Sequence, residues 1–191
     1  RLRSRGLGDV YKRQVYIFCT IQGNVLYNMG SLSVVDIINR QEYYRILTSL
    51  FLHANPQHIW GNMIFLAALG DMLERSIGHG RFFAIYMLAG IGGNLLSMGH
   101  ELATGQFCST IGASGAVFGL IGALLLLICK NNGTYGQISF RRMIFAIVYL
   151  FYSGTQSETT NNMAHLGGFI TGFAVMAVFY CITRRRYKRI R

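Results

Sequence analysis

The sequence predicts an all-α protein that crosses a membrane several times. Of its 191 residues, 52% are hydrophobic and only 13% are charged, which is typical of a polytopic helical membrane domain. Apolar runs close to the roughly 20 residues that span a bilayer recur along the chain, and no stretch is left over for a soluble domain. The formal net charge of +11 lies at the two ends and in short turns, so it indicates topology and argues against a nucleic-acid-binding face.

The first 14 residues differ in composition from the rest of the chain. They carry five of the 18 Lys and Arg residues but lack the apolar core of a signal peptide. Because the run from Asp9 to Gln14 resembles the translation of a sequencing adapter, we expect residues 1–14 not to be native. Val15 to about Tyr27 is then expected to be the tail of an incomplete first membrane helix, since its apolar run is too short to cross a bilayer.

A mixed segment, Gly30 to Pro56, comes next. Its charged residues cannot cross hydrocarbon, and we expect a long, partly helical loop at the membrane surface. Five apolar helices are expected after it, and with the incomplete first helix they complete a six-helix membrane domain over residues 15–183. Their predicted ranges are His58 to Leu73, Phe82 to Gly99, Ile111 to Cys129, Met143 to Phe151, and Met163 to Thr183. The helix beginning at Met143 is predicted to be the shortest.

The distribution of Arg and Lys predicts the orientation. The turns Glu74 to Arg81 and Lys130 to Arg142 and the basic tail 184–191 carry cations, whereas the turns His100 to Thr110 and Ser153 to Asn162 carry none. We therefore expect the cation-rich turns and the C-terminal tail to face the cytoplasm.

Three helices are then expected to run inwards from the outer side, each with polar residues in its first turns. They begin at His58, Ile111 and Met163. Ser114 taken alone is explained by helix packing, because Gly115 and Gly119 form a small-residue pattern. His165 at a matching depth of another helix changes this interpretation. A serine and a histidine that meet inside a membrane suggest a nucleophile and its base.

His58 and Asn62 are one helical turn apart and share a helix face. Two donors on one face beside a nucleophile are what an oxyanion hole needs. His58 taken alone could equally border the helix at the water interface. Asn62 lies among apolar residues, and because an unsatisfied amide in lipid is costly we expect it to have a partner inside the bundle.

Other intramembrane chemistries fit the sequence less well. A zinc protease needs a pattern such as HExxH, and none of the five histidines has it. An aspartyl protease needs two carboxylates at similar depth, and Asp71 has no such partner. The acidic residues that could complete a triad, Glu101 and Glu158, are both expected in loops, so a Ser–His dyad is more economical. The four cysteines form no CxxC pair, and no metal or cofactor is predicted.

Three stretches occur in a fixed order: His58-Ile59-Trp60-Gly61-Asn62, Gly112-Ala113-Ser114-Gly115 and Ala164-His165-Leu166-Gly167-Gly168. As an ordered set they resemble the rhomboid family of intramembrane serine proteases. The resemblance covers about Tyr43 to Gly172. It includes an HxxxxHxxxN pattern from His53 to Asn62, the stretch Glu74 to Gly78 that closes the family's second helix, and the GxxxG pair Gly168 and Gly172.

The resemblance implies that Ser114 is the nucleophile and that His165 is the general base and then the general acid. It also implies an oxyanion hole made by the backbone N–H of Ser114 and the side chains of His58 and Asn62. Gly112 would supply a close backbone approach beside this oxyanion hole.

Two positions depart from the family pattern. Phe118 replaces the Tyr of many relatives and is expected to pack against the His165 ring. Tyr44-Arg45 replaces the more usual Trp-Arg and is expected still to anchor the outer loop. Neither departure removes a group that the chemistry needs.

The resemblance thus predicts an intramembrane serine endopeptidase that cleaves transmembrane segments. Its predicted partners are transmembrane proteins and the lipid bilayer, with no nucleic acid, and no oligomeric state is predicted. We expect an integral protein of a bacterial plasma membrane with its active site open to the outer side. The alternative is a non-catalytic rhomboid-like binder or chaperone of membrane helices, and a small transporter or channel ranks last.

Overall fold

The computed structural model describes residues 25–157 and 160–183. Within these residues, five long helices form the bundle: α5 (Pro56–Ile77), α6 (His79–Thr104), α7 (Ser114–Lys130), α8 (Phe140–Thr155) and α9 (Asn162–Ile182). All five predicted apolar segments are therefore helical. The predicted non-native residues 1–14, most of the predicted first helix and the basic tail 184–191 lie outside the described residues.

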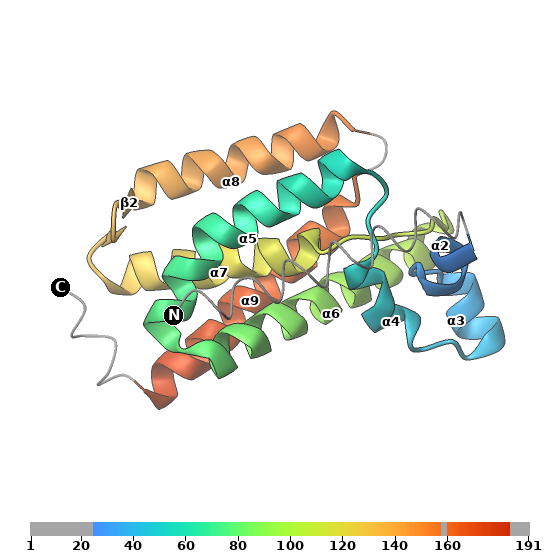
Figure 1. The fold of residues 1–191 in the computed structure, drawn as a ribbon, viewed down its shortest axis with the longest axis horizontal. Helices are drawn as coiled ribbons and strands as arrows, with labels where there is room; N and C mark the ends of the chain where they lie inside the picture. The colour runs from blue at the N-terminus through green and yellow to red at the C-terminus, as the bar shows by residue number, and fades with distance from the viewer. Residues whose placement is uncertain (1–24, 158–159, 184–191) are drawn as a thin grey trace.

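The segment before the bundle is partly helical, as predicted. Between Gly30 and Pro56 it contains the short helices α3 (Val34–Arg40) and α4 (Arg45–Thr48) and a 3-10 turn η1 (Ser49–Phe51). The short helix α2 (Val25–Gly30), which overlaps the end of the predicted first helix, precedes them. Figure 1 shows this segment at one end of the long helices. The exposed apolar side chains Ile38, Tyr43 and Leu47 fit the prediction that this segment lies at a membrane surface.

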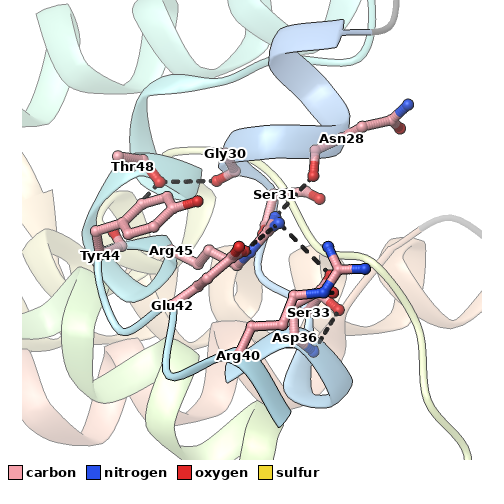
Figure 2. A network of polar contacts seen from close by, with 10 residues as sticks. All are labelled: Asn28, Gly30, Ser31, Ser33, Asp36, Arg40, Glu42, Tyr44, Arg45 and Thr48. Carbon is pink, nitrogen blue, oxygen red and sulfur yellow. Dashed lines mark hydrogen bonds and ion pairs between the residues drawn. The ribbon is translucent and has the colours of Figure 1, made fainter. Parts of the chain in front are cut away.

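Arg45 holds this surface segment together (Figure 2). Its side chain is 4% exposed and forms ion pairs with Glu42 at 2.6 Å and Asp36 at 3.5 Å. Its Nη1 also donates to the backbone oxygens of Asn28, at 2.8 Å, and Ser31, at 3.0 Å. The planar guanidinium therefore satisfies acceptors from α2, α3 and the turn before α4 at once. The predicted anchoring role of Arg45 is confirmed.

Local sequence explains where α5 and α6 begin and end. Asn55 caps α5 by accepting from the N–H of His58 at 2.8 Å, and Pro56 occupies the first turn, where its missing N–H costs nothing. Gly78 ends α5 at a φ of 87°, and Gly105 ends α6 at a φ of 70°, a conformation that glycine adopts without strain. The predicted closure of α5 by the stretch up to Gly78 is confirmed.

Several predicted helix boundaries were wrong. Helices α5, α6 and α8 end at Ile77, Thr104 and Thr155 and not at Leu73, Gly99 and Phe151, because each helix continues beyond its apolar run, and α6 begins at His79 and not at Phe82. Helix α7 begins at Ser114 and not at Ile111, because Gly112 has a φ of 131° and cannot continue a helix. Helix α8 begins at Phe140, before the predicted Met143, because Ser139 accepts from the N–H of Arg142 at 3.4 Å. With 16 residues, α8 is still the shortest of the five. A small antiparallel hairpin, β1 (Thr134–Tyr135) and β2 (Ile138–Ser139), joins α7 to α8.

Helix α7 is the buried centre of the bundle, and glycines bring α9 close to it. A Cβ on Gly168 would meet the backbone carbonyl of Gly115, and a Cβ on Gly172 would meet that of Gly119. The two predicted small-residue pairs therefore face each other across a single helix contact, where the backbones touch. By contrast, α8 buries only Met143 and Gly154 among its side chains and backbone positions, so it packs loosely against the bundle.

The long helices alternate in direction along the bundle (Figure 1). The N-terminal ends of α5, α7 and α9 lie at the same end of the bundle, beside the surface segment, as the polar residues in their first turns predicted. Among the described residues, α6 and α9 are long and apolar enough to cross a membrane, and α7 is a shorter apolar helix.

The contact between α7 and α9 predicts a large difference between two Gly→Ala substitutions in the bundle. Gly172→Ala forces a methyl group into the backbone of Gly119 and should lower stability by about 1–3 kcal/mol. Gly99→Ala meets nothing within 4 Å and should leave stability unchanged or raise it by up to about 1 kcal/mol. Thermal unfolding of both variants in detergent checks this, and equal melting temperatures would contradict the packing described for α9.

Candidate functional site

Ser114 and His165 meet where α7 and α9 begin. The Oγ of Ser114, the first residue of α7, lies 2.9 Å from the Nε2 of His165, in the first turn of α9. This separation is a hydrogen bond between a hydroxyl and an imidazole. The His165 side chain is buried, with 8% of its surface exposed, so the contact is largely shielded from bulk solvent.

The His165 ring is held on its face by an aromatic side chain. Phe118 stacks on it with ring centroids 4.1 Å apart and an interplanar angle of 10°, so the predicted packing of Phe118 on His165 is confirmed. Phe118 also makes an edge contact with Phe151 of α8, with centroids 5.1 Å apart. One ring thus contacts both His165 and the most loosely packed helix of the bundle.

No carboxylate among the described residues contacts the other nitrogen of His165. Its Nδ1 is buried and has no hydrogen-bond partner in residues 25–157 and 160–183. Glu101 lies in α6 and not in a loop as predicted, because α6 runs on to Thr104. Its carboxylate accepts from Ser97 and from the backbone of Cys108. Glu158 lies outside the described residues.

Gly112 brings the chain close to both His58 and Ser114. A Cβ at Gly112 would lie 2.7 Å from Cε1 of His58 and 3.8 Å from Oγ of Ser114. The close backbone approach predicted for Gly112 is therefore present, and it places the His58 ring beside the start of α7. The N–H of Gly112 donates to the carbonyl of Ser49 at 2.9 Å, so the surface segment fixes the position of Gly112.

Asn62 differs from its prediction in one respect. It is 6% exposed, one turn deeper in α5 than His58, but its Nδ2 has no hydrogen-bond partner among the described residues. The expected partner inside the bundle is thus absent from this part of the chain. A buried amide that lacks a partner is costly, and the cost is reasonable where the amide donates to a ligand.

The first N–H groups of α7 complete the set of donors. Helix α7 begins at Ser114, so the N–H of Ser114 has no partner within the helix. The N-terminus of a helix carries a partial positive charge and binds anionic oxygen atoms well. The start of α7 therefore combines a hydroxyl that contacts an imidazole with an N–H donor suited to an anionic oxygen.

Sequence reasoning missed several polar residues that support these groups. Asn94 of α6 is buried and donates from Nδ2 to the carbonyl of Ile46 at 2.8 Å and to Oγ of Ser49 at 2.9 Å. It therefore fastens the surface segment that holds Gly112. An amide within an apolar helix is the same signal that singled out Asn62. Among the described residues, no group of three or more His, Cys, Asp and Glu side chains could hold a metal ion.

Two described helices long and apolar enough to cross a membrane, a third shorter apolar helix and a polar site at one end of the bundle are features that polytopic helical membrane proteins have. Comparison with known proteins identifies the family. The family model of the Rhomboid domain matches residues 40–181, which include every residue of the site described above. The chain belongs to the rhomboid family.

Individual relatives agree with this family. The chain is 36% identical to RHOMBOID-like protein 1 of Arabidopsis thaliana over 156 residues, 81% of this chain and 39% of the relative. It is 34% identical to Rhomboid protease GluP of Bacillus subtilis over 142 residues, 74% of this chain and 27% of the relative. It is 34% identical to Rhomboid-like protease 1 of Toxoplasma gondii over 161 residues, 80% of this chain and 52% of the relative. The chain thus spans about half or less of the length of these relatives, and their range of organisms does not indicate a bacterial source.

The approach of Gly112 to His58 predicts a penalty that depends on the His58 ring. Gly112→Ala should lower stability by about 1–3 kcal/mol more than Gly105→Ala, because both positions have positive φ but only Gly112 faces a neighbour within 4 Å. When His58 is also changed to Ala, this extra loss of stability should shrink. Thermal unfolding of Gly112→Ala and Gly105→Ala, each with and without His58→Ala, measures the coupling between Gly112 and His58. An unchanged extra loss would show that His58 does not occupy the space beside Gly112.

Proposed function

We propose that this chain is an intramembrane serine endopeptidase that uses a Ser114–His165 dyad. The observation that carries the proposal is the 2.9 Å contact between Oγ of Ser114 and Nε2 of His165, because a serine is a weak nucleophile until an adjacent base accepts its proton. Membership of a family in which relatives are named proteases supports the same chemistry.

In the proposed reaction, Nε2 of His165 accepts the hydroxyl proton while Oγ of Ser114 attacks the scissile carbonyl carbon. The protonated imidazole then gives its proton to the leaving amine, and an acyl-enzyme ester remains on Ser114. A water molecule hydrolyses the ester with His165 again as the base. No third residue is required, since stacking on Phe118 already orients the ring.

The proposed oxyanion hole consists of the Ser114 backbone N–H and the side chains of His58 and Asn62, with Gly112 keeping the backbone close to them. The buried, unpartnered Nδ2 of Asn62 supports this assignment, because a preorganised donor stabilises charge that develops in the transition state. His58 is positioned for the same role by the cap that Asn55 places on the first turn of α5.

We further propose that the five long helices α5 to α9, together with an incomplete first helix from Val15 to about Tyr27, form a six-helix membrane domain. The cation-rich turns and tail face the cytoplasm, and the site opens towards the outer side. Substrates are the transmembrane segments of other proteins in the same bilayer. The alternative, a non-catalytic binder of membrane helices, shares the fold but needs no activated serine.

Serine reactivity separates these functions. The whole chain in detergent should be labelled by a fluorophosphonate probe, and labelling should fall to background in Ser114→Ala and in His165→Ala, because each removes one half of the dyad. Ser76→Ala and His100→Ala, which change the same residue types away from the site, should label like the parent.

Gel fluorescence of the labelled proteins provides the readout. A folded parent that takes up no probe would refute the protease and favour the binder. Labelling that survives in Ser114→Ala would place the reactive serine elsewhere in the chain.

Helix α8 is the proposed lateral gate, with the Ser153–Asn162 loop as a cap. Because α8 is loosely packed, a cross-link to α9 should restrict it.

A Cβ at Gly154 would lie 3.2 Å from Cγ of Asn162, which brings the two side chains within disulfide range. Oxidised Gly154→Cys/Asn162→Cys should therefore cleave a transmembrane substrate more slowly, while the small probe still labels Ser114. Reduction should restore cleavage, and the two single-cysteine variants serve as controls. Full cleavage by the oxidised form would eliminate α8 as the gate.

A further inference from the structure

Asn161 links the two chain segments that carry Ser114 and His165. It is the N-cap of α9, where its Oδ1 accepts from the N–H of Ala164 at 2.9 Å. Its backbone carbonyl accepts from the N–H of His165 at 3.2 Å. Asn161 therefore fixes the first turn of α9, in which His165 lies.

The amide nitrogen of the same side chain reaches away from α9. Nδ2 donates to Oγ of Ser97 on α6 at 2.6 Å and to Oγ1 of Thr110 at 2.8 Å. Thr110 precedes Ser114 by four residues, just as Asn161 precedes His165 by four. Both hydrogens of one amide thus bridge α9 to the segment that leads into α7 and to the helix packed beside both.

The acceptors of this bridge are themselves held in place. The backbone of Thr110 pairs with that of Leu32 through hydrogen bonds of 3.0 and 2.8 Å. Ser97 is 1% exposed and donates its hydroxyl hydrogen to Glu101 at 3.2 Å, which leaves its oxygen lone pairs to accept from Asn161. Glu101 also accepts from the backbone N–H of Cys108 at 3.3 Å. The bridge therefore ends on anchored groups, which gives it a defined length.

We propose that Asn161 is a positioning residue whose amide bridge to Thr110 and Ser97 sets the separation of Ser114 and His165. This inference rests on the proposed protease function. The N-cap alone would fix the start of α9 but not its distance from the segment before α7. Proton transfer needs heavy atoms within about 2.6–3.2 Å, and a misplacement of about 1 Å can cost a factor of about 100 in rate. The bridge acts on that distance without contacting substrate.

The test separates the bridge from the cap. Asn161→Ser keeps an oxygen that caps a helix well but is too short to reach both acceptors. Ser97→Ala/Thr110→Val leaves Asn161 and its cap intact and removes both acceptors. In each variant the maximal rate of fluorophosphonate labelling should fall about tenfold, while the probe concentration that gives half-maximal rate stays the same. Combining Asn161→Ser with Ser97→Ala/Thr110→Val should lower the maximal labelling rate no further than either set of changes does alone, because all three substitutions break the same bridge.

Asn131→Ser is the matched control. Asn131 donates from Nδ2 to the carbonyl of Thr134 at 2.9 Å, just past the far end of α7, and this variant should label at the parental rate. Parental rates in both bridge variants would overturn the inference. A labelling rate that falls only in Asn161→Ser, in proportion to a fall in its melting temperature, would also overturn the inference. That result would indicate that Asn161 acts only as the N-cap of α9. A parent that is not labelled would overturn the proposed function itself, whereas a labelled parent with unaffected variants overturns only the role of Asn161.

Discussion

The geometry of this protein depends on the contact between the backbones of α7 and α9. Gly115 and Gly119 face Gly168 and Gly172 so closely that a single added Cβ would enter the opposite main chain. In hydrocarbon the hydrophobic effect does not drive helices together, so packing at such short range is a main source of helix association. Ser114 is next to the first of these glycines and His165 lies less than a turn before Gly168. The contact therefore brings the starts of α7 and α9, and with them the hydroxyl and the imidazole, into the same neighbourhood.

The polar groups of the candidate site gather at the end of the bundle where helix starts and the surface segment can support them. Helix N-termini offer N–H groups without intrahelical partners, and the surface segment supplies acceptors and donors that apolar helices lack. Ser49 exemplifies this, since its carbonyl accepts from Gly112 and its hydroxyl from Asn94. Arg45 in turn secures the segment to which Ser49 belongs. The surface segment thus determines where the loop before Ser114 lies.

Most of the bundle and the principal candidate residues could be predicted from sequence for one reason. Apolar runs mark the helices, and a polar residue within such a run stands out, as Ser114, Asn62 and His165 do. The start of α7 could not be predicted because the φ of Gly112 is fixed by contacts with Ser49 and His58 that are distant in sequence. The supporting groups are harder to recognise. Asn161 lies in a run of small polar residues, where composition does not distinguish a structural amide from a solvated one. The sequence pattern places Glu101 in a loop because the apolar run ends before the helix does, and composition does not reveal that its carboxylate is buried and accepts from Ser97 and Cys108.

Rigid and loosely held parts meet at Phe118. Helices α6, α7 and α9 are fastened by glycine contacts and by the amide of Asn161, whereas α8 buries little of its surface. Phe118 belongs to the rigid part, yet it contacts Phe151 of α8 on one side and stacks on His165 on the other. A displacement of α8 can therefore change the packing around the imidazole while the α7–α9 contact keeps the starts of those two helices together. Loose packing of α8 is compatible with an ordered site because the contacts that hold α8 differ from those that hold Ser114 and His165.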